Sequence, residues 1–258
     1  MKAERFYLGE LTWPDVKDFL ANHDVIVIPV GSCEQHGPHL PLDTDAYDVF
    51  WLSQKAAEKA CCALVAPPIY YGVSSHHMDF PGTTTLKRHT LEQLAYEVAV
   101  SLIKHGFRKI VFENGHGGNT PALEAAVQRI KADTGAFVVV DTVSLIPEFI
   151  EEFIETPYDA HAGEFETSTT LANREEFVVT ERIRKPPIKL PESKYTKIGL
   201  KEKGPRVYWG FRTKEISETG VIGDPTKATK EKGEKAWRIA IERLAELLTE
   251  LDRMELES

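Results

Sequence analysis

A polar segment near the N-terminus, GSCEQHGPHLPLDTD at residues 31–45, concentrates side chains that can bind metal ions. In extended chain that leaves a strand, residues i and i+2 point the same way, so Glu34 and His36 can face one point. The glycine and the prolines that follow would turn the chain and return Asp45 to that point. This segment therefore predicts the first half of a metal site.

A second segment, ENGHGGN at residues 113–119, supplies another imidazole, His116, flanked by glycines. Imidazole nitrogen suits zinc, iron, nickel or manganese, and a carboxylate can bridge two cations through its two oxygens. We therefore predict that Glu34, His36, Asp45 and His116 are metal ligands. Gly117 and Gly118 would leave space for a substrate close to the backbone.

Each of these residues also has an ordinary structural explanation. Asp45 directly precedes a predicted helix, where an aspartate commonly caps the first turn. His116 alone could be a buried, hydrogen-bonded histidine. The glycine-rich NGHGGN also resembles a phosphate cradle that opens a helix, although it lacks the Walker lysine and the G-x-G-x-x-G pattern. Only the joint placement of the four residues favours a metal site.

Alternating strand and helix patterns position these segments. Apolar, β-branched runs predict strands at 24–31, 63–72, 108–115 and 136–143, and helical spacing predicts helices at 46–62, 90–106 (with Thr90 as N-cap and Gln93 completing a capping box), 119–135 and 231–254. This rhythm predicts a mostly parallel sheet with helices on both faces. Ligands of such sheets bind beyond the carboxyl ends of the strands, where both polar segments emerge.

A third polar segment, DAHAGEFETS at residues 159–168, follows the fourth strand and should reach the same edge. The histidines of SSHHMDFPGTTTL, His76 and His77, are either on the substrate side or in a structural turn. Residues 180–230 should form a structured excursion around the site, with one strand-like piece, RVYWGF, at 206–211. We expect one domain over residues 1–258.

Composition narrows the class of protein. The 258 residues carry a net charge of -9, which disfavours a nucleic-acid partner. No apolar run reaches the roughly 18 residues of a membrane span, and the N-terminus lacks the apolar region of a signal peptide. Three cysteines fit no disulfide framework, which indicates a reducing cytoplasm. Frequent Lys and Glu favour a thermophilic source.

Five motifs, PVGSCEQHGPHLPLDTD, HHMDFPGTTTL, ENGHGGN, HAGEFETS and GVIGDPTKATKEKG, resemble those of the creatininase (creatinine amidohydrolase) family in order, over residues 29–233. The resemblance implies a three-layer α/β/α sandwich, often a hexamer, with two divalent metal ions (Zn, Mn or Fe). It also implies that Glu34 and His116 bind one metal, that His36 binds the other, and that Asp45 bridges them.

The sequence departs from creatininase at two positions. Gly118 stands where creatininase has a metal-binding glutamate, and Glu164 stands where creatininase has none. We therefore predict that Glu164 supplies the missing carboxylate, to the second metal or to its bound water. Glu166 is the better candidate for the N-cap of a helix that begins near Thr167.

The resemblance implies a metal-dependent hydrolase that cleaves a C–N amide bond of a small, polar, cyclic or formylated substrate through a metal-bridging hydroxide. His161 or Glu164 would move the proton to the leaving nitrogen, and His77, Gly117 and Gly118 would contact the substrate. Creatinine is not the expected substrate, because the tryptophans that creatininase folds over it have no counterpart between residues 144 and 175. The alternatives are a ring-opening hydrolase of a cyclic ketone such as a keto-inositol, and a non-catalytic phosphate-binding protein.

Overall fold

The computed structural model describes residues 5–142, 147–191, 193, 195, 199–200, 207 and 209–256. Its centre is a parallel sheet of four strands in the order β2-β1-β3-β4, formed by Val25–Val30 (β1), Ala63–Val65 (β2), Lys109–Asn114 (β3) and Phe137–Thr142 (β4). Val30 pairs with Asn114, so β1 and β3 end level with each other. The two segments that leave these strands therefore start side by side.

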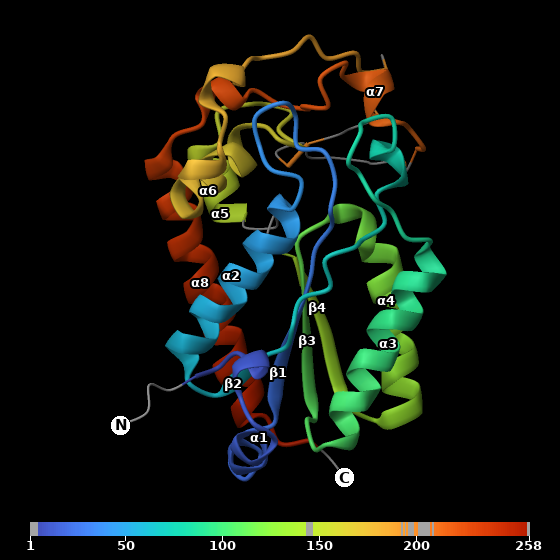
Figure 1. Cartoon of the computed structure of the whole chain (residues 1–258), viewed down its shortest axis with the longest axis vertical. Helices are drawn as coiled ribbons and strands as arrows, with labels where there is room; N and C mark the ends of the chain where they lie inside the picture. The colour runs from blue at the N-terminus through green and yellow to red at the C-terminus, as the bar shows by residue number, and fades with distance from the viewer. Residues whose placement is uncertain are drawn as a thin grey trace.

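Two helical layers cover the sheet, because both faces of its strands are apolar. Val25 and Val27 pack toward α2 (Thr44–Ala60) and α8 (Lys230–Arg253), whereas Ile26 and Ile28 pack toward α3 (Arg88–Lys104) and α4 (Thr120–Thr134). Figure 1 shows the two layers on either side of the sheet. Burial on both faces explains the nearly continuous apolar strands. The predicted three-layer α/β/α sandwich is confirmed.

Helix α8 uses its apolar stripe inside the chain. Trp237, Leu244 and Leu248 are buried in the core that α8 shares with α2 and the sheet. The ring of Trp237 lies 5.1 Å from that of Trp51 on α2, measured between centroids. This stripe packs on its own sheet and is therefore not a free surface for subunit assembly.

The start of α3 differs from its prediction. The helix begins at Arg88, and its N-cap, Lys87, lies three residues before the predicted cap Thr90. Gln93 does not close a capping box there; its amide donates to Glu97 at 2.6 Å, one turn further on. Strand β2 is also shorter than the predicted 63–72, because Pro67 and Pro68 follow it directly.

Most of the shorter elements lie near the carboxyl ends of the strands, at the top of Figure 1, whereas α1 (Trp13–Phe19) lies at the opposite end of the sheet. The remaining α-helices are α5 (Pro147–Phe153), α6 (Glu164–Asn173) and α7 (Thr213–Ile216), and the 3-10 helices are η1 (Leu8–Glu10), η2 (Ser75–His77), η3 (Gly117–Asn119), η4 (Glu175–Phe177), η5 (Thr180–Arg182) and η6 (Pro225–Lys227). Within the described residues, no helix has the length and hydropathy to cross a membrane.

The segment from 180 to 230 is folded back onto the rest of the chain at several points. Ile222 forms an isolated bridge with His161, and Oγ1 of Thr213 lies 2.9 Å from Nδ1 of His77. The strand-like piece RVYWGF lies partly outside the described residues, and its described part, Val207 and residues 209–211, is not in a strand. These contacts support the predicted structured excursion.

Candidate active site

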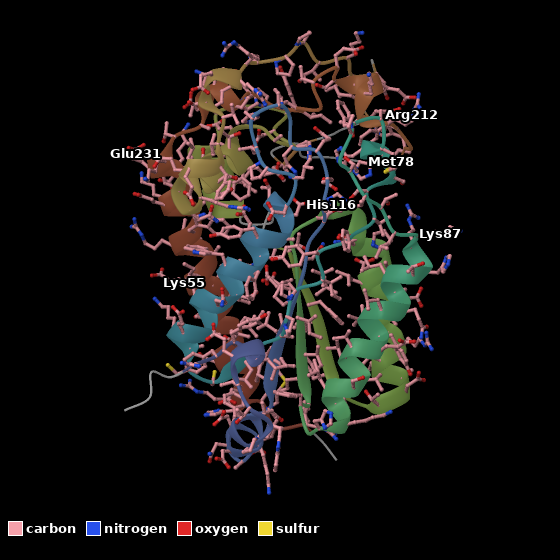
Figure 2. All side chains as sticks on the ribbon, in the orientation of Figure 1. Lys55, Met78, Lys87, His116, Arg212 and Glu231 are labelled. Atoms are coloured by element: carbon pink, nitrogen blue, oxygen red, sulfur yellow. The ribbon has the colours of Figure 1, made fainter. Side chains whose placement is uncertain are left out.

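Four of the predicted ligands meet beyond the carboxyl ends of β1 and β3. Glu34 and His36 lie in the segment after β1, and His116 follows β3 (Figure 2). Asp45 is the second residue of α2. All four side chains are buried, with Glu34 and His36 fully inaccessible to solvent. The topology of the sheet therefore brings together residues that are up to 82 positions apart, between 34 and 116 in the sequence.

Asp45 lies between the two imidazoles. Its Oδ1 is 3.0 Å from Nε2 of His36, and its Oδ2 is 3.4 Å from Nδ1 of His116. Asp43, and not Asp45, is the N-cap residue of α2. The capping role considered for Asp45 is therefore wrong, and its two oxygens instead face two separate nitrogen donors, as a bridging carboxylate requires.

Three atoms in this cluster are buried without a hydrogen-bond partner among the described residues: Glu34 Oε1, His36 Nε2 and Asp45 Oδ2. An unpartnered buried polar atom costs free energy, so such atoms are rare unless a ligand satisfies them. His36 donates from Nδ1 to the carbonyl of Glu34 at 3.2 Å, which leaves the Nε2 lone pair facing the carboxylates. Carboxylate oxygens and an imidazole lone pair fit a divalent metal ion.

The second imidazole is held in the same way by the backbone. Nε2 of His116 lies 3.0 Å from the carbonyl oxygen of Val73, which can only accept, so the proton sits on Nε2. Nδ1 then presents its lone pair toward Asp45. Glu34 Oε2 lies 3.2 Å from the same Nε2 and also accepts a short hydrogen bond from the hydroxyl of Ser74.

The cluster stabilises positive charge next to its carboxylates. Burial by itself lowers the pKa of His36, but Asp45 outweighs this and raises the pKa to about 10. Burial alone would raise the pKa of Asp45, yet the neighbouring His36 lowers it to about 2. His116 likewise has a raised pKa: burial opposes the charged form, and Glu34 overcomes it. A divalent cation would replace the protons on His36 Nε2 and His116 Nδ1 and would bind the lone pairs that these nitrogens then present.

A further carboxylate joins the cluster from α6. Glu166 Oε2 lies 3.7 Å from Nε2 of His36 and accepts a short hydrogen bond from the amide of Ala162. His36, Asp45 and Glu166 form one of the groups whose potential ligand atoms all lie within 4.8 Å of one another. Burial raises the pKa of Glu166 to about 8, although its side chain keeps 24% of its surface exposed, more than the other members of the cluster.

Glu164, the residue predicted for this position, points elsewhere. Its Oε2 accepts from the amide of Thr156 at 2.8 Å, and its Oε1 lies 2.6 Å from Nζ of Lys232. The structure therefore does not bring Glu164, the predicted ligand or proton shuttle, together with the other site residues. Helix α6 begins at Glu164 and not near Thr167, so Glu164 and Glu166 project about 200° apart around it, at about 100° per residue.

The two glycines after His116 are not equivalent. A Cβ atom on Gly118 would lie 2.2 Å from the carbonyl oxygen of Val73 and 2.4 Å from His116 Nε2. A glutamate at position 118 therefore has no room in this chain, and the carboxylate must come from another element. A Cβ on Gly117 would meet no described atom within 4 Å, because Gly117 borders the cavity in front of the cluster.

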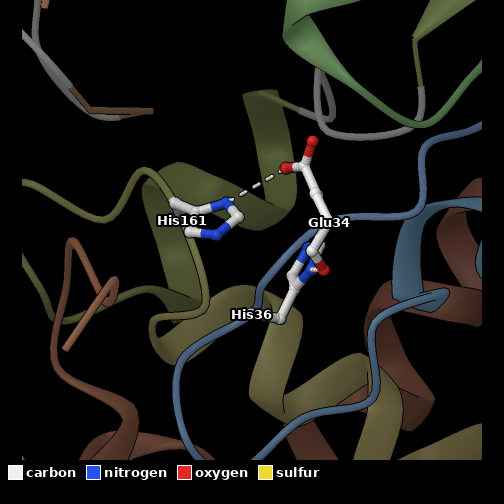
Figure 3. Close-up of side chains that lie close together, drawn as sticks. All are labelled: Glu34, His36 and His161. Carbon is white, nitrogen blue, oxygen red and sulfur yellow. Dashed lines mark hydrogen bonds and ion pairs between the residues drawn. The ribbon is translucent and has the colours of Figure 1, made fainter. Parts of the chain in front are cut away.

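Two more histidines line the opposite side of the cluster. Nδ1 of His161 lies 3.7 Å from Glu34 Oε1 (Figure 3), and Nε2 of His77 lies 3.2 Å from the same oxygen. Both rings are buried, which lowers the pKa of each well below its ordinary value. The structure thus places both predicted residues beside the cluster as neutral imidazoles.

A cavity of about 550 Å³ opens in front of these side chains. One wall of this cavity is aromatic: the ring of His76 lies 6.0 Å from that of Phe211, and Phe211 lies 4.9 Å from Trp209, measured between centroids. We call His76, Phe211 and Trp209 the aromatic wall. No sequence pattern assigned its last two members to the site, because they lie more than 90 positions after His116 and only the fold brings them there.

Comparison with known proteins agrees with this geometry. Residues 9–248 match the Creatininase family model, described as creatinine amidohydrolase. A mycofactocin precursor peptide peptidase of Mycolicibacterium smegmatis is 37% identical over 216 residues, covering 82% of this chain and 78% of that protein. A 3-dehydro-scyllo-inosose hydrolase of Thermotoga maritima is 29% identical over 261 residues, covering 95% and 83%.

Solved structures of creatininase share the whole fold. A crystal structure of creatinine amidohydrolase superposes with a TM-score of 0.83 at 26% identity, covering 98% of this chain and 100% of that one. A manganese form gives a TM-score of 0.81 at 26% identity, with 97% and 100% covered. The chain is therefore a member of the creatininase family, a hydrolase that acts on C–N bonds.

Proposed function

We propose that this chain binds two divalent metal ions, zinc, manganese or iron, through Glu34, His36, Asp45, His116 and Glu166. The observation that carries the proposal is the convergence of buried carboxylate and imidazole atoms without hydrogen-bond partners in the described structure. Glu34 and His116 would hold one ion, His36 and Glu166 the other, and Asp45 would bridge them. Metals bound there would activate a water molecule and polarise the carbonyl of the substrate.

The reaction is hydrolysis of a C–N amide bond. The water oxygen bonds to the carbonyl carbon, the C–N bond breaks, and the proton that the water loses passes to the leaving nitrogen. We assign this proton transfer to His161, because its neutral imidazole lines the cavity and its Nδ1 faces Glu34. Glu164 has no part in it, since its carboxylate is bound to the backbone and to Lys232.

The substrate that we propose is a small, polar amide, cyclic or formylated. From the aromatic wall we infer that one part of the substrate is flat, because ring faces stack on planar groups at little cost in entropy. Gly117 would leave the substrate close to the backbone. The similarity to a peptide peptidase extends the candidates to short peptides, and the similarity to an inosose hydrolase supports keto-inositols as the second class to test.

A substrate screen of metal-loaded protein tests this proposal. The purified chain is loaded with Zn²⁺, Mn²⁺ or Fe²⁺, its metal content is measured, and it is assayed on cyclic amides, formamides, short peptides and keto-inositols. We expect about two ions per chain and activity on an amide class that is lost with chelator and restored by the metal. Absence of bound metal, or activity that chelator does not change, would contradict the proposal.

We also propose that the protein acts as a homo-oligomer in the cytoplasm. All three of its cysteines are free, which supports a reducing compartment. A hexamer follows only from the family resemblance, since the stripe of α8 is buried within the chain. Light scattering at micromolar concentration tests the assembly, and a monomer would contradict it.

A further inference from the structure

Asn119 ends the polar segment that follows β3, and its side chain joins three separate parts of the chain. It is fully buried, and although it is the N-cap residue of α4 its side chain makes no capping hydrogen bond. Its Oδ1 accepts from the backbone amide of Val73 at 2.9 Å, and its Nδ2 donates to the carbonyl of Gly31 at 3.0 Å and to Oδ1 of Asn114 at 3.2 Å. One side-chain amide therefore connects the segments that follow β1, β2 and β3.

The backbone fixes the orientation of this amide. The amide of Val73 can only donate and the carbonyl of Gly31 can only accept, so a flipped Asn119 side chain would place donor against donor and acceptor against acceptor. Asn114 agrees with the same orientation, because its Oδ1 also accepts from the backbone amide of His116 at 3.1 Å. Each contact of Asn119 thus pairs a donor with an acceptor, and none of them depends on the protonation of a histidine.

Two of the three partners hold the proposed ligand His116. The carbonyl oxygen of Val73 lies 3.0 Å from Nε2 of its ring, and Asn114 binds its backbone amide. Asn119 also contacts this ligand directly, because its own backbone amide donates to the carbonyl of His116 at 3.0 Å. The ring and the backbone of His116 are therefore both anchored through Asn119.

The third partner, Gly31, connects the same amide to Asp45. A Cβ atom on Gly31 would lie 2.2 Å from Cα of Ala46, so Gly31 packs directly on the first turn of α2. Gly115 packs there too, since its Cβ would lie 2.6 Å from the carbonyl oxygen of Asp45. Oδ2 of Asp45 lies 3.4 Å from Nδ1 of His116, and this distance depends on how Gly31 is held relative to the segment after β3.

We propose that Asn119 is a positioning residue that sets the spacing between proposed ligands from different segments. It holds Gly31, and through Gly31 the start of α2 with Asp45, at a fixed distance from His116. This inference rests on the proposed metal site, in which the separation of Asp45 and His116 must match the size of an ion. Groups that orient metal ligands without binding the metal contribute about 10- to 100-fold to metal affinity.

Asn119→Ala tests the inference, because it removes all three side-chain contacts and leaves every proposed ligand in place. Zn²⁺ affinity is measured by competition with a chromophoric chelator, and we expect it to fall about 10- to 100-fold. The visible absorption bands of bound Co²⁺ should also shift, because they report the geometry of the ligands. Ile130→Ala is the matched control: it truncates a fully buried core side chain on α4, so it should lower the melting temperature but keep the zinc affinity and the cobalt spectrum.

Gly72→Ala changes the same junction without removing any of its hydrogen-bonding groups. A Cβ on Gly72 would lie 2.5 Å from Oδ1 of Asn119 and 2.6 Å from the carbonyl oxygen of Gly31, while the φ of Gly72 lies outside the left-handed region. The added methyl group should displace Asn119 relative to Gly31 and lower the zinc affinity, as Asn119→Ala does. This variant tests the inference even if Asn119→Ala does not fold.

Crystal structures of the unmodified chain and of both variants, all prepared without metal, measure the ligand spacing directly. In the variants the distance between Asp45 and His116 should change by about 0.5 Å or more, the tolerance within which a functional site is held. Failure of the unmodified chain to bind zinc contradicts the proposed function, and these structures still test the inference. The inference is overturned if the spacing is the same in the variants as in the unmodified chain, or if Ile130→Ala weakens zinc binding as much as Asn119→Ala.

Discussion

Glu164 and Glu166 lie two positions apart on α6, and their carboxylates serve opposite sides of the helix. Glu166 Oε2 is 3.7 Å from Nε2 of His36, whereas Glu164 Oε1 is 2.6 Å from Nζ of Lys232. Glu164 is fully buried and accepts backbone hydrogen bonds from the segment that precedes α6. Glu166 belongs to the candidate metal site, and Glu164 stabilises the fold.

Glu166→Gln and Glu164→Gln should therefore fail differently. Glu166→Gln replaces a charged oxygen that faces the metal site with a neutral amide, so we expect it to retain about one ion per chain and to lose turnover by about 10²-fold or more, with the melting temperature preserved. Glu164→Gln should keep both ions and lose roughly 1–3 kcal/mol of unfolding free energy, because Lys232 loses its buried charged partner. Metal analysis and thermal melts of both variants distinguish these two roles. Loss of metal in Glu164→Gln alone would reverse the assignment.

Asp45→Asn tests the proposed bridge. Asparagine has nearly the same shape but lacks the charge and one of the two oxygens that face His36 and His116. We expect turnover to fall by about 10²-fold or more and metal content to drop, while circular dichroism shows an intact fold.

Asp43→Asn is the matched control for the Asp45 variant. Asp43 is the N-cap residue of the same helix and pairs with Arg174 at 2.7 Å, away from the cluster. Its variant should retain metal and activity, because the Asp43 side chain makes no capping hydrogen bond and its carboxylate pairs only with Arg174 among the described contacts. A fully active Asp45→Asn enzyme would show that this residue does not bridge metals.

The sequence alone predicts the sheet and the meeting of the ligands for a clear physical reason. Runs such as VIVIPV in β1 are buried on both faces, so their strand type is unambiguous, and parallel strands deliver their following loops to one edge. Glu34, His36 and His116 then have only one place to meet. Asp45 reaches the same place only if the chain turns between His36 and Asp45, and the glycine and prolines of that segment supply this turn.

The role of Glu166 could not be predicted because it depends on where α6 begins. Asp159 accepts from the amides of Glu164 at 2.7 Å and Phe165 at 2.8 Å, so the helix starts three residues before the predicted position. This cap acts from five residues upstream, outside the usual N-cap spacing. The position of the first helical residue determines the direction in which each later side chain points around the helix axis. Because α6 begins earlier than predicted, Glu166 faces the cluster and Glu164 faces away from it.

Contacts between residues far apart in the sequence could not be predicted from the sequence either. Gln35 meets the carbonyl of Gly220, 185 positions away, and His77 meets Thr213, 136 positions away. No local period or motif spacing encodes these pairs. They follow from how residues 209–223 fold over the carboxyl ends of the strands.

Asp48 should make the stability of the fold depend on pH. Burial raises its pKa from 3.8 to about 7 in the folded state, where Asn173 donates to it at 2.8 Å. The neutral acid favours the folded state, so its contribution is fully present below about pH 4 and is lost as pH rises to about 7. Asp48→Asn stays neutral and should gain a few kcal/mol relative to the unmodified chain over that window, at about 1.4 kcal/mol per pKa unit.

Urea unfolding at pH 4.5 and pH 7.5, with the same metal present, measures the Asp48 effect. The difference in unfolding free energy between variant and unmodified chain should grow with pH. Asp18→Asn changes an exposed acid on α1 and should leave that difference constant. If the two variants respond to pH alike, Asp48 is not held neutral in the folded protein.

The aromatic wall should determine substrate affinity more than turnover. Phe211 lines the cavity and its ring packs against Trp209 and His76, so Phe211→Ala removes stacking surface and should leave the metals in place. For a substrate with a flat group, we expect KM to rise about 5- to 30-fold, which corresponds to roughly 1–2 kcal/mol of binding, with kcat changed less than threefold.

Phe177→Ala is the matched control for Phe211→Ala, because Phe177 is 51% exposed and contacts Arg174 away from the cavity. A substrate without a flat group should bind both variants equally. If KM rises for every substrate, or if kcat falls while KM is unchanged, then Phe211 supports the metal site and does not select the substrate.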